Sequence, residues 1–267
     1  MSSYVHPSSY VDKNAIISDG VSIGPFCIVG PDVRLGNNVE LVAQVNLSGT
    51  TSIGKDCKLY PFVSMGHPPQ DIKHKGGAVS IEIGERCVFR ENVNIHPGVD
   101  YGEPVTRIGN DCYFMVGAHL AHEGQMGDNV IVSNGAQIGG NVKIGHYVVL
   151  GGLSAIHQHT RIGDHAFIGG MATVTKDVIP YGSVVGNKAY LAGLNIIGLK
   201  RRGYSRDAIA HLRSAYRMLF AQEGTFSERI SDAESVFSDN KHAMEIVNFI
   251  NNSFHRRICM PASWKQS

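Results

Sequence analysis

Apolar residues recur at every sixth position along the first two-thirds of the chain. The recurrence is unbroken through residues 5–65, 83–95 and 108–174, where each sixth residue is aliphatic, Phe or Met. Because only 43% of all residues are hydrophobic, chance does not explain this regularity. A tandem period of six residues is typical of a parallel β-helix, in which every repeat supplies one short strand. We therefore predict a left-handed, triangular parallel β-helix with three repeats, about 18 residues, in each coil.

Two further positions of the repeat are restricted. The residue after the inward aliphatic one is often Gly, as at Gly24, Gly54 and Gly139, and we expect this Gly to permit the turn geometry at low steric cost. The fourth residue after the aliphatic one is small or β-branched and should fill a corner. Four cysteines occupy this fourth position, so we interpret them as core residues of a protein from a reducing cytosol: Cys27, Cys57, Cys87 and Cys112.

Two polar segments, residues 67–82 and 101–107, interrupt the register, and we predict loops there that project from the prism and carry function. The repeat ends after Pro180, and a helical pattern begins with Ser205 as the predicted N-cap. We predict two domains, a β-helix over residues 1–190 and a small α-helical domain over residues 191–267. The apolar helical positions are Ile209, Leu212, Tyr216 and Leu219, followed by Ala243, Met244, Val247, Ile250 and Phe254.

Charge and hydropathy narrow the class of protein. The formal net charge of +1 argues against nucleic acid or an anionic membrane as the main partner. No apolar stretch approaches the roughly 18 residues of a membrane span, and residues 1–7 lack the basic and apolar regions of a signal peptide. We therefore expect a soluble, cytoplasmic protein.

The repeat register places several histidines along one edge of the prism. His122 lies two residues after an inward Leu, and steps of one coil from it reach Gly140 and Gln158. Asn141 and His157 adjoin those positions, His96 falls one coil below, and His119 lies across a corner. The predicted polar column is about 15 Å tall. We expect the other histidines to be scattered over the surface: His67, His74, His146, His165, His211, His242 and His255.

This column suits acid–base chemistry. Histidine accepts a proton near neutral pH, and Glu123, directly after His122, would fix its tautomer. A Gly one coil away offers an unshielded backbone N–H for an oxyanion. Because no Ser or Cys in the column stands out as a nucleophile, the pattern favours direct, base-assisted transfer.

Three segments resemble the UDP-N-acetylglucosamine acyltransferases of lipid A biosynthesis: residues 117–123 (GAHLAHE), 69–76 (PQDIKHKG) and 193–203 (GLNIIGLKRRG). The resemblance extends over nearly the whole chain, and the three motifs are far more specific than the repeat. It implies a homotrimer with sites between subunits, and neither a cofactor nor a metal ion.

The resemblance also implies roles for individual residues. His122 would be the general base on the sugar 3-hydroxyl, which attacks the thioester of a 3-hydroxyacyl group on acyl carrier protein. Gly140 would form the oxyanion hole, Glu123 would support the base, and Gly170 would limit acyl length. The sugar and acyl site would be lined by Asp71, Lys73, His119, His157 and Gln158, and the nucleotide diphosphate or phosphopantetheine arm would meet Asn195, Arg201 and Arg202.

Two residues depart from the family pattern. Glu123 stands where members commonly have Asp, and Asn141 stands where the usual residue is a His that contacts the acceptor. A neutral amide would tolerate an amine, so N-acylation of the 3-amino analogue of the UDP-sugar remains an alternative. The basic run Lys200-Arg201-Arg202, with Arg206, Arg213 and Arg217, is interpreted as a docking face for acyl carrier protein, against the alternative of a solvated helical face.

Two other functions fit a β-helix with histidines. A zinc hydrolyase of the γ-carbonic-anhydrase type would use three histidine ligands, with His119 and His122 as two of them. It would leave the 69–76 and 193–203 motifs without a role. A purely structural β-helix would present a repetitive face of one residue type, whereas this column is chemically mixed.

Overall fold

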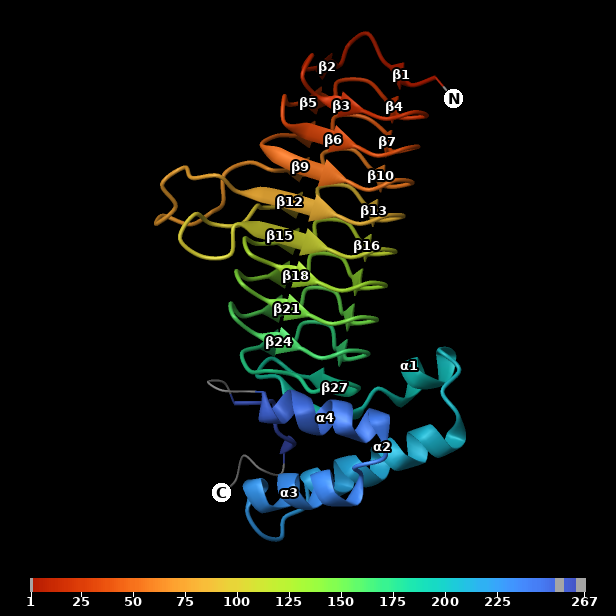
Figure 1. Ribbon diagram of the computed structural model, residues 1–267, viewed down its shortest axis with the longest axis vertical. Helices are drawn as coiled ribbons and strands as arrows, with labels where there is room; N and C mark the ends of the chain where they lie inside the picture. Colours follow the sequence, from red (N-terminus) through yellow and green to blue (C-terminus); the bar gives the residue numbers. More distant parts are fainter. Residues whose placement is uncertain (1, 253–256, 263–267) are drawn as a thin grey trace.

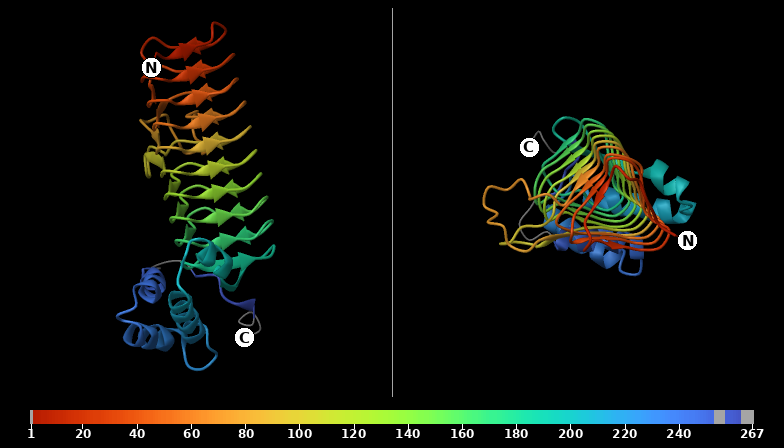
Figure 2. Two further views of the ribbon diagram at one scale, coloured as in Figure 1. Left: turned by 90° about the vertical axis from the view of Figure 1, so that its right-hand side faces the viewer. Right: turned by 90° about the horizontal axis from the view of Figure 1, so that it is seen from above.

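The computed structural model describes residues 2–252 and 257–262. The chain forms a triangular prism of parallel strands, with helices at its C-terminal end (Figures 1 and 2). This left-handed parallel β-helix with a small helical region confirms the predicted fold class. Three sheets, named faces A, B and C here, form the sides of the prism.

Face A contains β1 (Tyr4–Val5), β4 (Ser22–Ile23), β7 (Glu40–Leu41), β10 (Lys58–Leu59), β13 (Val88–Phe89), β16 (Tyr113–Phe114), β19 (Ile131–Val132), β22 (Val149–Leu150), β25 (Phe167–Ile168), β27 (Gly182–Val185) and β28 (Tyr190–Leu194). Face B contains β2 (Tyr10–Val11), β5 (Ile28–Val29), β8 (Asn46–Leu47), β11 (Ser64–Met65), β14 (Asn94–Ile95), β17 (His119–Leu120), β20 (Gln137–Ile138), β23 (Ala155–Ile156) and β26 (Thr173–Val174). Face C contains β3 (Ile16–Ile17), β6 (Val33–Leu35), β9 (Thr50–Ile53), β12 (Ser80–Ile83), β15 (Val105–Ile108), β18 (Gln125–Met126), β21 (Lys143–Ile144) and β24 (Arg161–Ile162).

The core follows the predicted six-residue register. In each two-residue strand the second side chain points inward, so Ile23, Leu41 and Leu59 stack on consecutive coils with no exposed surface. The chain passes from face A to B to C and back, which defines corners AB, BC and CA. Every residue therefore has a fixed corner or face, set by its position in the repeat.

Both predicted loops project from corner BC (Figure 2). They join β11 to β12 and β14 to β15, so the first spans residues 66–79 and the second residues 96–104. The predicted bounds, 67–82 and 101–107, are wrong at their ends, because residues 80–82 and 105–107 pair as parallel strands. The second loop also begins five residues earlier than predicted.

The predicted reason for the recurrent Gly is wrong. The left-handed backbone occurs three residues after the inward side chain, at Phe26 (φ 57°) and Asn38 (φ 59°), and Gly24 is not among the positive-φ residues. A Cβ on Gly24 would lie only 1.8 Å from the Val42 carbonyl oxygen of the next coil. Gly is therefore required at this position by the close approach of stacked corners.

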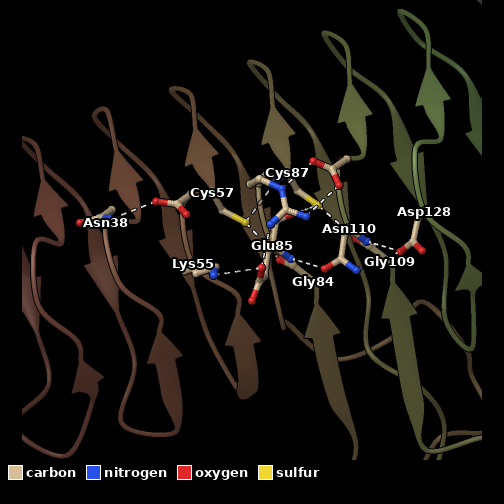
Figure 3. A network of polar contacts seen from close by, with 12 residues as sticks. Asn38, Lys55, Cys57, Gly84, Glu85, Cys87, Gly109, Asn110 and Asp128 are labelled. Carbon is tan, nitrogen blue, oxygen red and sulfur yellow. Dashed lines mark hydrogen bonds and ion pairs between the residues drawn. The ribbon is translucent and has the colours of Figure 1, made fainter.

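The four repeat cysteines are buried free thiols in the core, as predicted. At corner CA the backbone N–H of Cys87 donates to the Cys57 sulfur at 3.3 Å (Figure 3). The contact with the Cys87 thiol, together with burial, raises the pKa of Cys57. Cys259, to which the sequence assigned no role, is also buried.

Corner CA shows how a coil satisfies its corner amides. The backbone N–H of the second residue after the inward one donates to a side-chain oxygen of the next coil. Glu85 N donates to Asn110 Oδ1 at 2.8 Å, and Asn110 N donates to Asp128 Oδ1 at 2.7 Å (Figure 3). The corner amides at this position of corner CA are therefore satisfied by side chains.

The helical region comprises α1 (Ile196–Arg201), α2 (Arg206–Leu219), α3 (Phe226–Val236) and α4 (Lys241–Asn251). Ser205 caps α2 by accepting from the Ala208 N–H, as predicted. The sequence pattern did not predict α3, and Phe254 lies outside the described residues. The predicted boundary at residue 190 stays a prediction, although β28 crosses it and pairs with β27. No helix in the described ranges is long and apolar enough to span a membrane.

Candidate active site

A histidine–carboxylate pair lies at corner BC, beside both loops. His122 follows β17, and its Nδ1 lies 2.9 Å from Glu123 Oε2. Glu123 occupies the left-handed corner position, with φ 62°. Because the chain turns sharply at this corner, the consecutive side chains of His122 and Glu123 point to the same side of the backbone and meet. Because an ionised carboxylate only accepts, Nδ1 carries the proton and Nε2 presents a lone pair.

The carboxylate of Glu123 is buried but fully partnered. Its side chain is 7% exposed. Besides His122, it accepts from the Glu103 backbone N–H at 2.9 Å and from Asn141 Nδ2 at 3.3 Å, both on Oε1. The two residues predicted to depart from the family pattern, Glu123 and Asn141, thus contact each other.

Gly140 lies one coil beyond His122 and presses against its imidazole ring. A Cβ at residue 140 would lie 2.4 Å from His122 Cε1 and 2.6 Å from Nε2. Unlike the capped corner CA amides, the Gly140 N–H donates to no group within residues 2–252 and 257–262. The structure therefore places the backbone of a residue whose N–H has no partner among the described residues against the imidazole of His122.

Asp71 of the first loop faces the other imidazole nitrogen. Its Oδ2 lies 3.8 Å from His122 Nε2. The Tyr101 hydroxyl donates to the same oxygen, and the Lys73 N–H donates to Oδ1 at 2.7 Å. These hydrogen bonds, that from Tyr101 first, lower the pKa of Asp71. The Lys73 side chain itself is exposed.

Two further histidines, His119 and His96, lie near His122. His119 Nδ1 lies 3.0 Å from Asn94 Oδ1, and the ring of His96 packs edge-on against His119 at 5.2 Å. Burial lowers the pKa of His119, and burial followed by the charge of His119 lowers the pKa of His96 to about 4. His96 is therefore neutral at physiological pH and adds no positive charge beside His122.

The comparisons with known proteins agree with this geometry. The UDP N-acetylglucosamine O-acyltransferase domain 2 model matches residues 177–259, and a bacterial transferase hexapeptide model matches residues 14–49. The acyl-[acyl-carrier-protein]–UDP-N-acetylglucosamine O-acyltransferase of Caulobacter vibrioides is 50% identical over 96% of this chain and 98% of its own. The chain belongs to the UDP-N-acetylglucosamine acyltransferase family.

Relatives and solved structures extend this finding. The Mesorhizobium japonicum relative of the same name is 50% identical over 97% of this chain and 92% of its own. The UDP-N-acetylglucosamine O-acyltransferase of Moraxella catarrhalis superposes with a TM-score of 0.91 at 35% identity, over 96% of this chain and 98% of that one. The acyltransferase of Francisella novicida gives 0.91 at 30% identity, over 96% and 93%.

Other predicted residues of the acyltransferase lie away from His122 in the single chain. Asn195, Arg201 and Arg202 line a hollow of about 690 Å³ between face A and α1. Arg202 donates to the Tyr147 carbonyl at 2.7 Å, and Asn195 caps α1. These two side chains fasten α1 to the prism, whereas Arg201 is exposed.

Three more predicted residues lie along the prism. His157 and Gln158 follow Gly140 by one coil at corner BC, and both are exposed. They lie outside the hydrogen bonds described above for His122. Gly170 lies at corner AB, and a Cβ there would meet nothing closer than 3.4 Å. One chain therefore brings together His122, the carboxylates of Asp71 and Glu123, and Gly140, but not the residues expected at the nucleotide or the acyl terminus.

Several histidines predicted to be scattered surface residues have defined partners. His165 is stacked between the Tyr147 and Tyr181 rings at 4.9 and 5.3 Å, and burial lowers its pKa to about 4. His242 Nδ1 lies 3.0 Å from the Tyr181 hydroxyl. The prediction is wrong for these two, because aromatic packing joins the prism to α4 there. It is also wrong for His74, whose side chain is 9% exposed and contacts Asp100. His146 is exposed, as predicted, and accepts from the Asp128 N–H, and His67 is partly exposed and lies near His96.

The remaining two histidines that were predicted to lie on the surface are His211, which is exposed, and His255, which lies outside the described residues.

The zinc alternative requires a cluster of ligands. Within the part of the chain that the structure describes, no three His, Cys, Asp or Glu side chains are grouped so that they could hold a metal ion. The mixed chemistry of corner BC is likewise unlike a purely structural β-helix.

Proposed function

We propose that this chain transfers a 3-hydroxyacyl group from acyl carrier protein to the 3-hydroxyl of UDP-N-acetylglucosamine, the first step of lipid A biosynthesis. The observation that carries the proposal is the His122–Glu123 pair beside the free N–H of Gly140. Relatives named for this reaction, 50% identical over nearly the whole chain, support it.

The geometry supports a direct transfer. His122 Nε2 takes the proton of the sugar hydroxyl while its oxygen attacks the thioester carbonyl carbon. The Gly140 N–H then donates to the carbonyl oxygen as it becomes an oxyanion. The carrier thiolate leaves and recovers the proton from the imidazolium, which Glu123 stabilises until then. The proposed roles of Asp71, Lys73 and His119 are to line the sugar and acyl site.

A simple assay tests the proposed reaction. Purified enzyme should release the free thiol of the carrier protein only when the acyl thioester and the nucleotide sugar are both present. Thiol release that does not depend on the sugar would show hydrolysis and would refute acyl transfer.

We further propose that the enzyme is a homotrimer with its site between subunits. Corner AB carries bulky side chains in left-handed backbone, at Phe26, Phe62, Leu153 and Met171, with exposed fractions of 65, 54, 66 and 71%. Such a backbone is costly for bulky residues, and an exposed apolar row is typical of an interface. Contact between corner AB of one subunit and corner BC of the next would bring Gly170 towards His122.

Gly170→Met should shift the acyl-length preference towards shorter chains. A Cβ at residue 170 would meet the Gly152 carbonyl oxygen at an ordinary van der Waals distance of 3.4 Å, so a thioether there can be accommodated and would occupy the end of the proposed acyl groove. We expect a change of about 1–3 kcal/mol between long and short thioesters, the range for mismatched methylenes in a pocket. The measurement is kcat/KM over a series of acyl chain lengths, and an unchanged profile would refute the role.

The acceptor proposed is the 3-hydroxyl rather than a 3-amino group. The 3-amino analogue was an alternative acceptor because a neutral amide at Asn141 would tolerate an amine. This amide donates to Glu123 and so has a partner within the site. The relatives named above are O-acyltransferases. The cytoplasmic location stays a prediction, to which the five buried free thiols lend support.

Reversing two charges on α2 should weaken the interaction with acyl carrier protein. Arg206, Arg213 and Arg217 are exposed on one side of α2, and complementary charge mainly raises association rate and salt sensitivity. The Arg206→Glu/Arg213→Glu variant should raise KM for the carrier thioester and spare KM for the nucleotide sugar. Added salt should have the same effect on the wild type.

The matched control for this prediction reverses Lys13, between β2 and β3, and Arg34 in β6; these strands lie at the opposite end of the prism (Figure 1). That variant should behave as wild type. If the α2 variant and high salt both leave the KM of the carrier unchanged, the basic residues are only a solvated helical face.

A further inference from the structure

The second loop, residues 96–104, contacts the carboxylates on both sides of His122. The Tyr101 hydroxyl donates to Asp71 Oδ2, the oxygen that lies 3.8 Å from His122 Nε2. The Glu103 N–H donates to Glu123, which binds His122 Nδ1. One loop therefore determines where the negative charge lies around both imidazole nitrogens.

The loop is itself held tightly in place. A Cβ on Gly102 would lie 2.3 Å from Glu123 Oε1, so the loop backbone packs directly on this carboxylate. Asp100 Oδ2 accepts from the Lys75 and Gly77 N–H groups at 3.1 Å each, which ties the second loop to the first. The position of Tyr101 relative to Asp71 is therefore fixed by backbone contacts, although the tyrosine ring is more than half exposed.

The Tyr101 hydrogen bond opposes a competing contact. Glu123 and Asp71 are the charged groups that face His122, with His119 and the buried His96 behind it. A free Asp71 needs to move less than about 1 Å to reach hydrogen-bond distance from Nε2. That contact would stabilise the imidazolium and occupy the nitrogen needed as the base. The hydrogen bond to Asp71 raises the pKa of Tyr101 to about 12, so its hydroxyl remains a donor.

We infer that Tyr101 is a positioning residue: by binding the Asp71 oxygen nearest His122, it keeps Nε2 free for the acceptor hydroxyl. The inference rests on the proposed function for the identity of that acceptor. It assigns the second loop a role in setting the protonation of the base, which the repeat pattern does not indicate.

Tyr101→Phe tests the inference because it removes only the hydroxyl. In the free protein, the NMR titration midpoint of the His122 imidazole should rise by about 1 pH unit, as a carboxylate moves closer to the charged form. The acid limb of kcat/KM should move to higher pH by a similar amount. Turnover should fall by up to about tenfold on the acid side, the most that a rise of 1 pH unit allows, with the thermal midpoint of unfolding unchanged.

Two controls separate positioning from other causes. Tyr10→Phe removes a similar exposed pair, between the Tyr10 hydroxyl and Asp12 Oδ2 at 3.2 Å, and should change none of these quantities. In an Asp71→Asn background, Tyr101→Phe should have no further effect on the His122 titration, because its partner charge is gone.

The outcomes distinguish the inference from the proposed function. An unmoved His122 titration in Tyr101→Phe, or an equal shift in the Asp71→Asn background, would overturn the positioning role. This measurement needs no substrate. A wild-type enzyme without acyl transfer would refute the proposed function instead, whatever the titration gives.

Discussion

His122→Ala is expected to lower turnover at least about 10²-fold, the lower range for loss of a general base. Gly140 packs against the His122 imidazole, and the ion pairs of His122 within the described residues are with carboxylates, Glu123 at Nδ1 and Asp71 at Nε2. The side chain is 16% exposed and lies outside the apolar core, so the fold should persist.

The measurement is kcat with saturating carrier thioester and nucleotide sugar, with circular dichroism to verify folding. His6→Ala, on the first coil, is the matched control and should retain wild-type turnover. A folded His122→Ala enzyme with near-normal kcat would eliminate His122 as the base.

Gly140→Ala should be nearly as damaging, although it adds only a methyl group. A Cβ at residue 140 would lie 2.4 Å from His122 Cε1, closer than real Cβ atoms approach, so the imidazole must move. The variant keeps the N–H but separates it from the base. We expect a loss in kcat of at least about 10²-fold, the effect of removing one oxyanion donor.

Gly30→Ala provides the control for that variant. A Cβ there would have its nearest neighbour, the Leu47 carbonyl oxygen, at 3.3 Å, and the site is far along the prism. This variant should retain full turnover, and its free energy of unfolding should fall only slightly. If Gly140→Ala also retains wild-type kcat while remaining folded, the close approach of Gly140 and His122 has no catalytic role.

Much of the fold could be predicted because the prism repeats. Once Ile23 and Leu41 are recognised as stacked inward residues, a step of one coil carries any residue to its neighbour. A step of 18 residues also predicted that Gly140 lies one coil from His122, on the same corner. Their contact is found in the structure, whereas their catalytic roles remain predictions.

The loops could not be predicted in this way. Tyr101 meets Asp71 and Glu103 meets Glu123, but both loops lie outside the register, so no period relates these positions. The only available signal was a polar interruption next to the histidine column. The role of Gly24 could not be predicted for a different reason. The repeat shows that Gly is preferred at this position, but it does not show whether a positive φ or the close approach of the neighbouring coil requires it.

The register also contained information about the subunit arrangement. Gly170 follows His122 by two and two-thirds coils, and the fraction means that it lies at a different corner of the prism. In the proposed trimer, a groove that connects the two residues is completed by a second subunit. Sequence periodicity describes one chain and gives no direct signal for the contacts between chains.

The product of the purified enzyme tests the central claim most directly. The enzyme would receive a 3-hydroxyacyl carrier protein together with equal amounts of UDP-N-acetylglucosamine and its 3-amino analogue, and mass spectrometry would identify the acylated sugar. We predict acylated UDP-N-acetylglucosamine with the chain in an ester at the 3-position, which mild base removes. Exclusive formation of a base-stable amide on the analogue, or no acylated sugar at all, would contradict the account.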